Sequence, residues 1–465
     1  MKNIHRTVLL FCFSIIISVV LQAQPGNPFG NPLIPDMIAD ASIIEINGTF
    51  YCYATTDGYD RHLDTSGPLV IWKSKDFVNW SFSGNYFPSA IGQLYWAPSK
   101  AVAANGKYYI YPTVNGFMYP AIADSPEGPF KLAKGTDFFI KPFSTGTLLP
   151  SKNSKEPRGI DAEIFIDDDK QAYVFWQLRH AARLNADMVT VDTNYFNIPT
   201  PREGYSEGPV FFKRKGIYYY LYTLGGDEKY QYAYIMSRKS PVGPFEFPEN
   251  DIIATTNYER GIYGPGHGCV FNLTGTDKYY FAFLEFGRRS TNRQTYVNQM
   301  EFNEDGTIRP VDLTLNGVGA LRKIPHDKKI KVLNSSVSTT RPVLDIKYMK
   351  DSLFKRQEYF VSQFAFDGEN GSRWMADTTV TDTWIIADLG KIRKVKRSEV
   401  YFVRPTAGHS YLIEFSADGK TWTSCGGHPD LKIQSPHIDS LYVKARYFRI
   451  KIIEGVREIW EWNFY

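Results

Sequence analysis

The sequence predicts an all-β protein, a five-bladed β-propeller followed by a β-sandwich (jelly-roll) domain. Three observations support this prediction. Aromatic residues make up 15% of the 465 residues, the chain contains 36 Gly and 27 Pro, and one strand–turn–strand unit recurs five times. Aromatic residues favour strands, while Gly and Pro favour tight turns. A chain of this length is expected to form two or three domains.

The recurring unit consists of a short apolar strand, a turn with Gly, Asn or Asp, and a second strand rich in aromatic residues. Its copies are residues 41–56, 99–114, 162–177, 208–223 and 268–283. Successive copies begin 46 to 63 residues apart, which leaves room for the four strands of a propeller blade. A tandem of two-sheet sandwiches is the alternative, and the regular return of one unit argues against it.

The N-terminus has the pattern of a secretory signal peptide, which we place at residues 1–23. Lys2 and Arg6 precede an apolar run of 14 residues, and Ala23 is a small residue suited to cleavage. This run is shorter than the roughly 20 residues that a membrane-spanning helix needs. We therefore expect a secreted or periplasmic protein with no membrane span after cleavage. The formal net charge of +4 argues against a nucleic-acid binder that works through bulk charge.

The composition changes after Gly319. Residues 323–342 are basic and then rich in Ser and Thr, and they lack the repeated unit. From about Tyr359 a different β pattern begins, with strands that end in Gly turns. We predict that residues 24–325 form the propeller and that residues 326–465 form a linker and the β-sandwich.

Acidic residues occupy the same place in three of the five units, directly before the first strand. They are Asp40, Asp161 and Glu207, and the fifth unit has His267 there. The inner strands of a propeller all start at one mouth of the central channel, so we expect these side chains to face one another. Two carboxylates that flank a glycosidic bond are the usual equipment for hydrolysing it. The alternative is that each of the three carboxylates caps an unrelated turn on the surface. Their shared position in the repeated unit argues against this alternative.

The motifs around these residues resemble the five-bladed propeller enzymes of glycoside hydrolase family 43. They are IADAS, YWAPSK, GIDAEIFIDDD, YSEGPVFFKRKGIYYYLYT and GPGHG, within about residues 27–322. The resemblance implies inversion at the anomeric carbon, with Asp40 as the general base and Glu207 as the general acid. It assigns to Asp161 the orientation of the acid and the tuning of its pKa.

The same resemblance implies roles for three further residues. His267 is expected in the channel, Arg293 is expected to contact the sugar, and Trp96 is a candidate for stacking on a sugar face. No cofactor is expected to be required, and the one metal that the resemblance allows is Ca²⁺, held by His267 through water.

The expected substrate is a plant cell-wall polysaccharide or oligosaccharide. The resemblance implies an exo-acting enzyme that releases α-L-arabinofuranosyl or β-D-xylosyl residues. A β-galactosidase-type activity in the same fold is one alternative, and a non-catalytic sugar-binding propeller lectin is the other. A lectin needs aromatic and amide contacts but has no use for an acid and a base. Two departures from the family pattern bear on which sugar is bound: Ala41 follows the expected base, and residues 285–287 read Glu-Phe-Gly.

The C-terminal region resembles discoidin-type (coagulation factor 5/8 C) sandwiches, including carbohydrate-binding modules of family 32. The motifs are FDGENGSRWMA, WIIADLG, YLIEFSADGKTW and RYFRIKI. In that fold, loop residues at one end hold the ligand, and Arg404, His409 and Trp460 are the candidates here. The alternative is that this domain only braces the propeller. Because the candidate catalytic residues precede residue 294, we expect deletion of residues 326–465 to leave the hydrolysis of small substrates intact.

Overall fold

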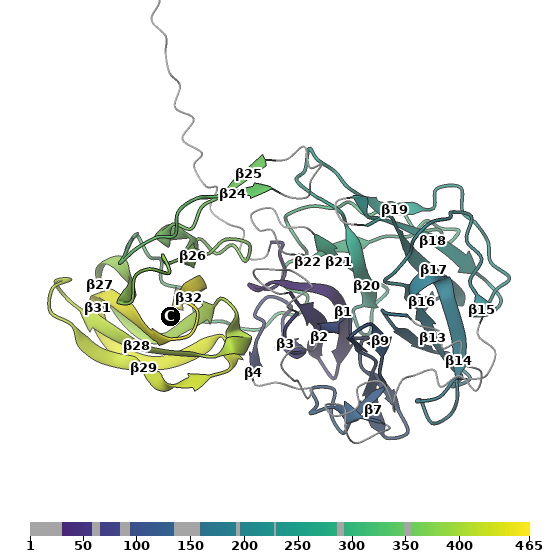
Figure 1. Cartoon of the computed structure of the whole chain (residues 1–465), viewed down its shortest axis with the longest axis horizontal. Helices are drawn as coiled ribbons and strands as arrows, with labels where there is room; N and C mark the ends of the chain where they lie inside the picture. Colours follow the sequence, from purple (N-terminus) through teal and green to yellow (C-terminus); the bar gives the residue numbers. More distant parts are fainter. Residues whose placement is uncertain are drawn as a thin grey trace, which may run out of the picture.

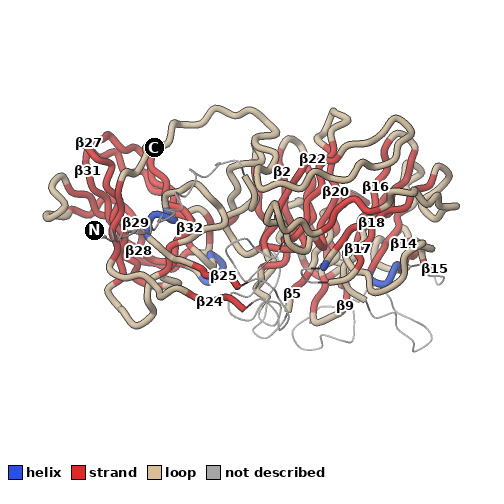
Figure 2. Tube along the Cα trace, turned by 90° about the horizontal axis from the view of Figure 1, so that it is seen from above, coloured by secondary structure: helices blue, strands red, loops and turns tan. Residues whose placement is uncertain are grey.

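The computed structural model describes residues 30–57, 66–83, 94–133, 159–191, 196–226, 229–285, 293–347 and 355–465. The chain folds into a propeller, on the right of Figure 1, and a C-terminal sandwich on the left. Strands dominate both parts, and helix is limited to short 3₁₀ turns (Figure 2). The predicted signal peptide and residues Phe286–Gly287 lie outside the described residues. Within them, no helix has the length and apolar character needed to cross a membrane.

Five antiparallel sheets form the propeller, and each repeated unit of the sequence forms the first hairpin of one sheet. The first sheet contains β1 (Ile38–Ile46), β2 (Thr49–Thr56) and β3 (Val70–Ser74), and the second β6 (Val102–Ala104), β7 (Lys107–Ile110), β10 (Ala121–Ala123) and β11 (Lys131–Leu132). The third contains β12 (Glu163–Ile166), β13 (Ala172–Trp176), β14 (His180–Leu184) and β15 (Phe196–Asn197). The fourth contains β16 (Val210–Arg214), β17 (Ile217–Leu224), β18 (Gln231–Ser237) and β19 (Ile252–Thr255), and the fifth β20 (Gly266–Asn272), β21 (Tyr279–Glu285) and β22 (Gln294–Met300).

Side-chain packing joins these sheets into a ring. One buried apolar cluster lies between each sheet and the next along the chain. A further cluster joins the fifth sheet to the first, where Cys269 and Phe271 pack with Ile43 and Phe50. The backbone N–H of Ile43 also donates to Sγ of Cys269 across 3.1 Å. The predicted five-bladed propeller is therefore confirmed. A small sheet of β5 (Tyr95–Trp96), β8 (Thr113–Val114) and β9 (Phe117–Met118) lies beside the second blade.

The C-terminal domain is the predicted β-sandwich. Its two longest strands, β27 (Thr383–Phe402) and β31 (His437–Glu454), pair along most of their length and change register near residues 388–393 and 395–397. The first half of β27 pairs with the end of β31. The end of β31 also pairs with β28 (His409–Ser416). The second half of β27 pairs in addition with β32 (Glu458–Phe464). The remaining strands are β23 (Asn334–Val337), β24 (Leu344–Lys347), β25 (Lys355–Glu358), β26 (Trp374–Met375), β29 (Thr423–Lys432) and β30 (Gln434–Ser435).

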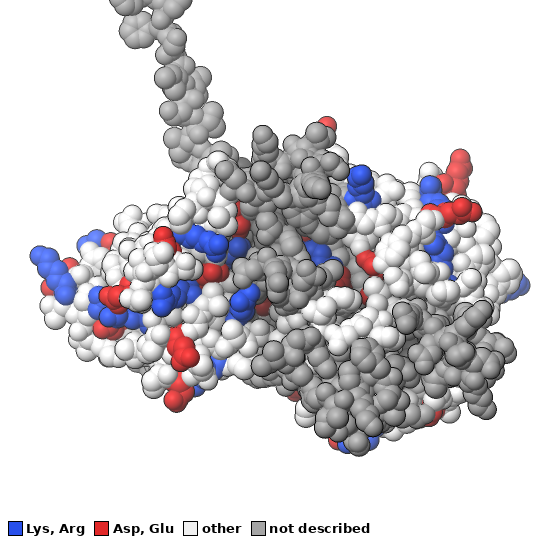
Figure 3. All heavy atoms as spheres, viewed as in Figure 1, with Lys and Arg blue, Asp and Glu red and all other residues white. Residues whose placement is uncertain are grey.

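Charged side chains of both signs are interspersed over the face of this domain seen in Figure 3. Ion pairs join neighbouring strands of the domain, such as Arg446 with Asp388 at 2.8 Å and Arg449 with Glu414 at 2.7 Å. Apolar side chains fill the interior, and Trp462, Phe464 and Phe448 form part of its aromatic centre.

The two domains contact each other directly. Strand β30 pairs with β4 (Phe82–Ser83) of the first blade. Met37 of the propeller packs in one buried cluster with Tyr401, Val403 and Trp460 of the sandwich.

These contacts correct two of the predicted sugar-binding residues. Trp460 and His409 are 0% exposed, so neither side chain is available to a ligand. Trp460 lies at the domain contact, and His409 stacks on Phe402 with ring centroids 4.4 Å apart. Arg404 is half-buried and acts electrostatically on Asp36 of the propeller. The resemblance identified a fold, but it did not indicate which end of the sandwich meets the propeller.

Buried histidines make the stability of the C-terminal domain sensitive to acid. Burial lowers the pKa of His409 and of His437 to about 3. In the unfolded chain both have a pKa near 6.5, so between about pH 6.5 and 3 the unfolded state binds more protons than the folded state. We predict that the free energy of unfolding of this domain decreases as pH falls through that range, by up to about 1.4 kcal/mol per pH unit for each histidine.

Urea midpoints measured by circular dichroism from pH 7 to 4 test this prediction. His409→Phe removes one of the two groups and should make the pH dependence shallower. A variant with an unchanged slope would show that His409 does not contribute. Ile413→Val, which shortens a buried side chain of the same domain and removes no ionisable group, is the control and should lower the midpoints without changing the slope.

Candidate active site

The sequence-predicted acidic residues and His267 lie together at one place. Nδ1 of His267 is 3.6 Å from Oδ1 of Asp40 and 3.4 Å from Oδ2 of Asp161. The backbone N–H of Gly208, which follows Glu207, donates to Oδ2 of Asp161 across 3.1 Å. Asp40, Asp161 and His267 are buried, whereas Glu207 is half-buried. Residues from four different blades or their lead-in segments therefore meet in one cluster.

The backbone at both buried carboxylates has an unusual conformation. Asp40 has a φ of 52° and Asp161 a φ of 68°, in the left-handed region that non-glycine residues avoid. Asp40 also lies where the β1–β2 pairing shifts register between Ala39 and Ser42. Such backbone strain costs about 1–3 kcal/mol per residue and is concentrated at functional sites. Each conformation is supported locally, since the N–H of Asp161 donates to Oγ1 of Thr113 at 3.0 Å.

Asp40 is held as a carboxylate. It accepts hydrogen bonds from Oγ1 of Thr55 at 2.6 Å and from Nη1 and Nη2 of Arg293 at 2.8 and 3.1 Å. Burial raises the pKa of Asp40, but the charge of Arg293, the neighbouring His267 and the Thr55 hydroxyl outweigh it, so the pKa is lowered overall. The side chain is therefore ionised at neutral pH and able to accept a proton.

Arg293 lies behind Asp40. Its guanidinium also donates to Asp57, from Nε at 3.1 Å and from Nη2 at 2.8 Å, and it is 7% exposed. Arg293 therefore lies at the site, and its predicted contact with the sugar stays a prediction. Most of the N–H donors of Arg293 bind the carboxylates of Asp40 and Asp57, so its main structural role is to hold Asp40 in position.

Asp161 has the opposite electrostatic character. Burial and the nearby carboxylates of Glu207 and Asp40 raise its pKa well above the usual value. Asp161 therefore keeps its proton at a pH where Asp40 has lost its own.

Two tyrosines hold the Glu207 carboxylate. The hydroxyl of Tyr205 donates to Oε2, and that of Tyr230 donates to Oε1. Burial and the charge of Glu207 raise the pKa of both phenols, so they remain donors. Glycine at position 266 is required for this arrangement, because an added Cβ would lie 2.5 Å from the Tyr230 ring. Gly208 has a similar role beside His267, where a Cβ would lie 2.6 Å from the imidazole.

Trp96 lies at the edge of the same region. It is half-buried, and its Nε1 donates to Oγ of Ser66 at 2.9 Å. The next residue, Ala97, donates its N–H to Oγ1 of Thr55 at 2.8 Å, which links this strand to the hydroxyl that supports Asp40. The position is compatible with the predicted stacking role, which stays a prediction.

Sequence reasoning missed several residues of the site. Thr55 lies within β2, Asp57 directly follows that strand, and Tyr230 directly precedes β18, and none of them belongs to a motif that we recognised. Tyr205 belongs to the YSEGP motif, and its position two residues before Glu207 was an available signal. Among the described residues, no group of three His, Cys, Asp or Glu side chains has the arrangement of a metal site. A water-mediated Ca²⁺ at His267 stays a prediction.

Comparison with known proteins identifies both parts of the chain. The model of the family "Glycosyl hydrolases family 43" matches residues 29–308, and that of the "F5/8 type C domain" matches residues 349–463. The chain is 31% identical over 323 residues to the β-D-galactofuranosidase xynD of Aspergillus niger, covering 62% of this chain and 86% of that protein. It is 24% identical over 426 residues to an extracellular endo-α-(1→5)-L-arabinanase of Thermotoga petrophila, covering 71% and 85%. A solved structure titled "Glycoside hydrolase" is 69% identical, with a TM-score of 0.90, and covers 95% of this chain and 100% of that one.

The low pKa of Asp40 depends on its partners. In Arg293→Gln the main counter-charge is lost while burial remains, so we predict that the pKa of Asp40 rises above its usual value near 3.9. Thr55→Val removes one hydrogen bond with little change in shape and should produce a smaller rise. The measurement is a pH titration of the Asp40 carboxyl carbon by NMR in labelled protein. Arg322→Gln, which removes an ion pair with Glu45, is the control. An Asp40 pKa that stays low in both variants would refute this account.

Proposed function

This chain is a glycoside hydrolase of family 43, and from that premise we propose that it is an inverting, exo-acting enzyme. It releases α-L-arabinofuranosyl or β-D-xylosyl residues from plant cell-wall polysaccharides or oligosaccharides. The observation that carries the proposal is the opposite electrostatic character of carboxylates within one cluster. Asp40 has a lowered pKa, and Asp161, next to the proposed acid, has a raised one. One carboxyl group that is ionised and a second region that favours a bound proton are what glycoside hydrolysis requires.

In the proposed mechanism, Asp40 takes a proton from a water molecule, which attacks the anomeric carbon. The bond to the leaving oxygen breaks on the opposite face, and Glu207 protonates that oxygen. Attack opposite to the leaving group inverts the anomeric configuration. Asp161 orients the protonated Glu207 and tunes its pKa, while Tyr205 and Tyr230 fix the carboxyl of Glu207 in place.

The proposed sugar is supported by the relatives. A B. subtilis protein that is 27% identical over 373 residues is named an arabinoxylan arabinofuranohydrolase, and that match covers 67% of this chain and 69% of the relative. A second candidate is a β-D-galactofuranosyl residue, because the A. niger relative is named for that activity. The rings of α-L-arabinofuranose and β-D-galactofuranose have the same configuration, and the galactose carries one additional exocyclic carbon. A pocket for the first sugar therefore needs only extra space to accept the second.

The proposed location is outside the cytoplasm, which the extracellular relatives and the signal-like N-terminus support. The proposed catalytic unit is residues 24–325. No metal is proposed to take part in the chemical step. If Ca²⁺ is bound, His267 is the residue that would hold it through water.

Assays on aryl glycosides identify the sugar. We expect turnover of the α-L-arabinofuranoside or the β-D-xyloside to exceed that of the β-D-galactofuranoside and β-D-galactopyranoside, with no loss after treatment with EDTA. A preference for the galactofuranoside would support the second candidate. If the folded protein binds sugars but cleaves none of the four, the non-catalytic lectin alternative is favoured.

Substitution of the carboxylates separates their roles. Asp40→Asn should remove turnover of every substrate, because no water is activated. Glu207→Gln should lose about 10²–10⁴-fold on a natural oligosaccharide but much less on a dinitrophenyl glycoside, whose leaving group needs no proton. Asp161→Asn should move the basic limb of the pH profile to lower pH, because a like charge that raised the pKa of the acid is lost.

Asp124→Asn, at an exposed surface carboxylate, is the control and should retain the normal rate. Proton NMR of the first-formed sugar completes the test, and a product with the substrate's anomeric configuration would contradict inversion. Equal losses of Glu207→Gln on both substrate types would exclude Glu207 as the acid.

A further inference from the structure

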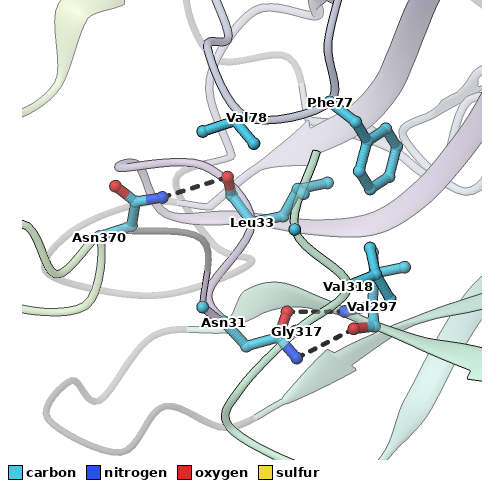
Figure 4. Close-up of a pocket in the computed structure, with 10 residues that line it drawn as sticks. Asn31, Leu33, Phe77, Val78, Val297, Gly317, Val318 and Asn370 are labelled. Carbon is cyan, nitrogen blue, oxygen red and sulfur yellow. Dashed lines mark hydrogen bonds between the residues drawn. The ribbon is translucent and has the colours of Figure 1, made fainter. Parts of the chain in front are cut away.

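The chain that leads into the first blade is irregular but fully buried. Residues 32–37 precede β1 and belong to no strand, yet each of them is buried. Buried backbone outside regular structure needs other hydrogen-bond partners. Part of this need is met by the fifth blade: the side chain of Asn31 pairs with the backbone of Val297, and the N–H of Leu33 donates to the carbonyl of Thr295 at 2.8 Å (Figure 4).

The C-terminal domain supplies further partners of this segment. Nδ2 of Asn370 donates to the carbonyls of Pro32 and Leu33 at 3.0 and 3.1 Å, and Figure 4 shows the amide of Asn370 directed at Leu33. Nε2 of Gln294 lies between the carbonyls of Asp36 and Asn370, at 3.3 Å from each. One asparagine of the sandwich and one glutamine of the propeller therefore fix the segment from both sides.

A second contact lies at the end of the segment. Asp36 is 0% exposed, and Arg404 of the sandwich is the positive group that acts on it. Burial raises the pKa of Asp36 to about 7, while the Met37 N–H and Arg404 oppose that rise and Asp57 adds to it. The Met37 side chain packs among Tyr401, Val403 and Trp460 of the sandwich.

From this segment a short path of hydrogen bonds leads to the catalytic cluster. The carbonyl of Met37 accepts the N–H of Asp57 at 2.9 Å. The carboxylate of Asp57 holds Arg293, and Arg293 holds both oxygens of Asp40. Gln294 is the residue directly after Arg293, and Asp40 follows Met37 by three residues.

We propose that the C-terminal domain is a working part of the catalytic centre, in which Asn370 is a positioning residue for Asp40. It acts through residues 32–37 and through Arg293 rather than on the substrate. The proposal rests on the proposed role of Asp40 as the base. The proposal gives the C-terminal domain a role other than sugar binding through Trp460 and His409, whose side chains are buried.

The loop that carries Asn370 is built to hold this position. Its neighbours are fixed within the sandwich: the N–H of Gly368 donates to Glu461 at 2.8 Å, and the Ser372 hydroxyl donates to Asp367 at 2.7 Å. Gly371 touches the propeller, because a Cβ there would lie 3.2 Å from Cδ of Pro32. The FDGENGS motif thus forms a domain contact in this chain.

This arrangement argues against the expectation that residues 326–465 are dispensable for hydrolysis. Their deletion would leave the carbonyls of Pro32 and Leu33 without Asn370 and would expose Met37. A displacement of about 1 Å in a catalytic group is enough to lower turnover about 100-fold. Asp40 sits in a strained backbone conformation that its surroundings must maintain.

The test compares full-length variants. Asn370→Ala removes the two hydrogen bonds, and Asn370→Asp keeps the shape but places an acceptor against two carbonyls. We expect both to lower kcat about 10-fold or more with little change in KM, and Asn370→Asp to be the more severe. The acidic limb of the kcat/KM profile should move to higher pH, because a displaced Arg293 lowers the pKa of Asp40 less.

The matched control is His326→Ala. It breaks the hydrogen bond between Nε2 of His326 in the linker and Oδ2 of Asp76 in the first blade, which are 2.6 Å apart. It should lower the melting temperature without moving the pH profile. If the Asn370 variants change only the melting temperature, as His326→Ala does, the positioning role is refuted.

Hydrogen exchange of the β1 amides tests the proposal without relying on enzyme activity. We expect exchange at residues 38–41 to accelerate in the Asn370 variants and to stay unchanged in His326→Ala. If the wild-type protein hydrolyses no glycoside, the proposed function fails, while this measurement still reports whether the domain holds β1. Unchanged exchange in a folded Asn370→Asp variant would refute the proposal even where the enzyme is active.

Discussion

The buried contact of Arg293 with Asp40 and Asp57 is the interaction on which the rest of the site depends. It joins the start of β22 in the fifth blade to β1 and the end of β2 in the first, where the ring of blades closes. A buried ion pair stabilises a protein only when its geometry and remaining hydrogen bonds are well satisfied, because removing the charges from water is costly. Here Thr55 supplies one of those bonds to Asp40, and the Arg293 backbone N–H supplies one to Asp57.

The same contact explains why similar burial gives two carboxylates opposite properties. Asp40 and Asp161 are both 4% exposed. Asp40 faces a guanidinium that is always charged, whereas Asp161 faces Glu207 and accepts one backbone N–H from Gly208. The placement of one arginine therefore separates a carboxyl group with a lowered pKa from one with a raised pKa, and acid and base roles are commonly divided in this way.

Sequence reasoning found the parts of this site that the repeat makes visible. Asp40, Asp161, Glu207 and His267 occupy equivalent positions at the beginning of a blade, and a ring of blades necessarily brings such positions together. Thr55 corresponds to Thr113 of the second unit, and each hydroxyl accepts a backbone N–H from the segment that leads into the next blade, so the repeat offered a signal for it. Asp57 and Tyr230 lie outside the repeated units, so no periodicity identified them. Their roles depend on which side chain of one blade reaches across to the next, and the pairing pattern within a sheet does not specify this.

The C-terminal domain shows a different limit of sequence reasoning. Its motifs identified the fold correctly, but a sandwich has several faces, and the motifs do not indicate which face meets a neighbouring domain. The choice is made by shape and by unsatisfied groups on the partner. Pro32 and Leu33 present two buried carbonyls that the propeller leaves unpaired in its own sheets, and Asn370 has the two amide hydrogens that match them. A domain docked in this way is fixed against residues 32–37, which lead into the strand that carries Asp40. The position of Asp40, and with it the electrostatics of the propeller site, therefore depends on the fold of the second domain.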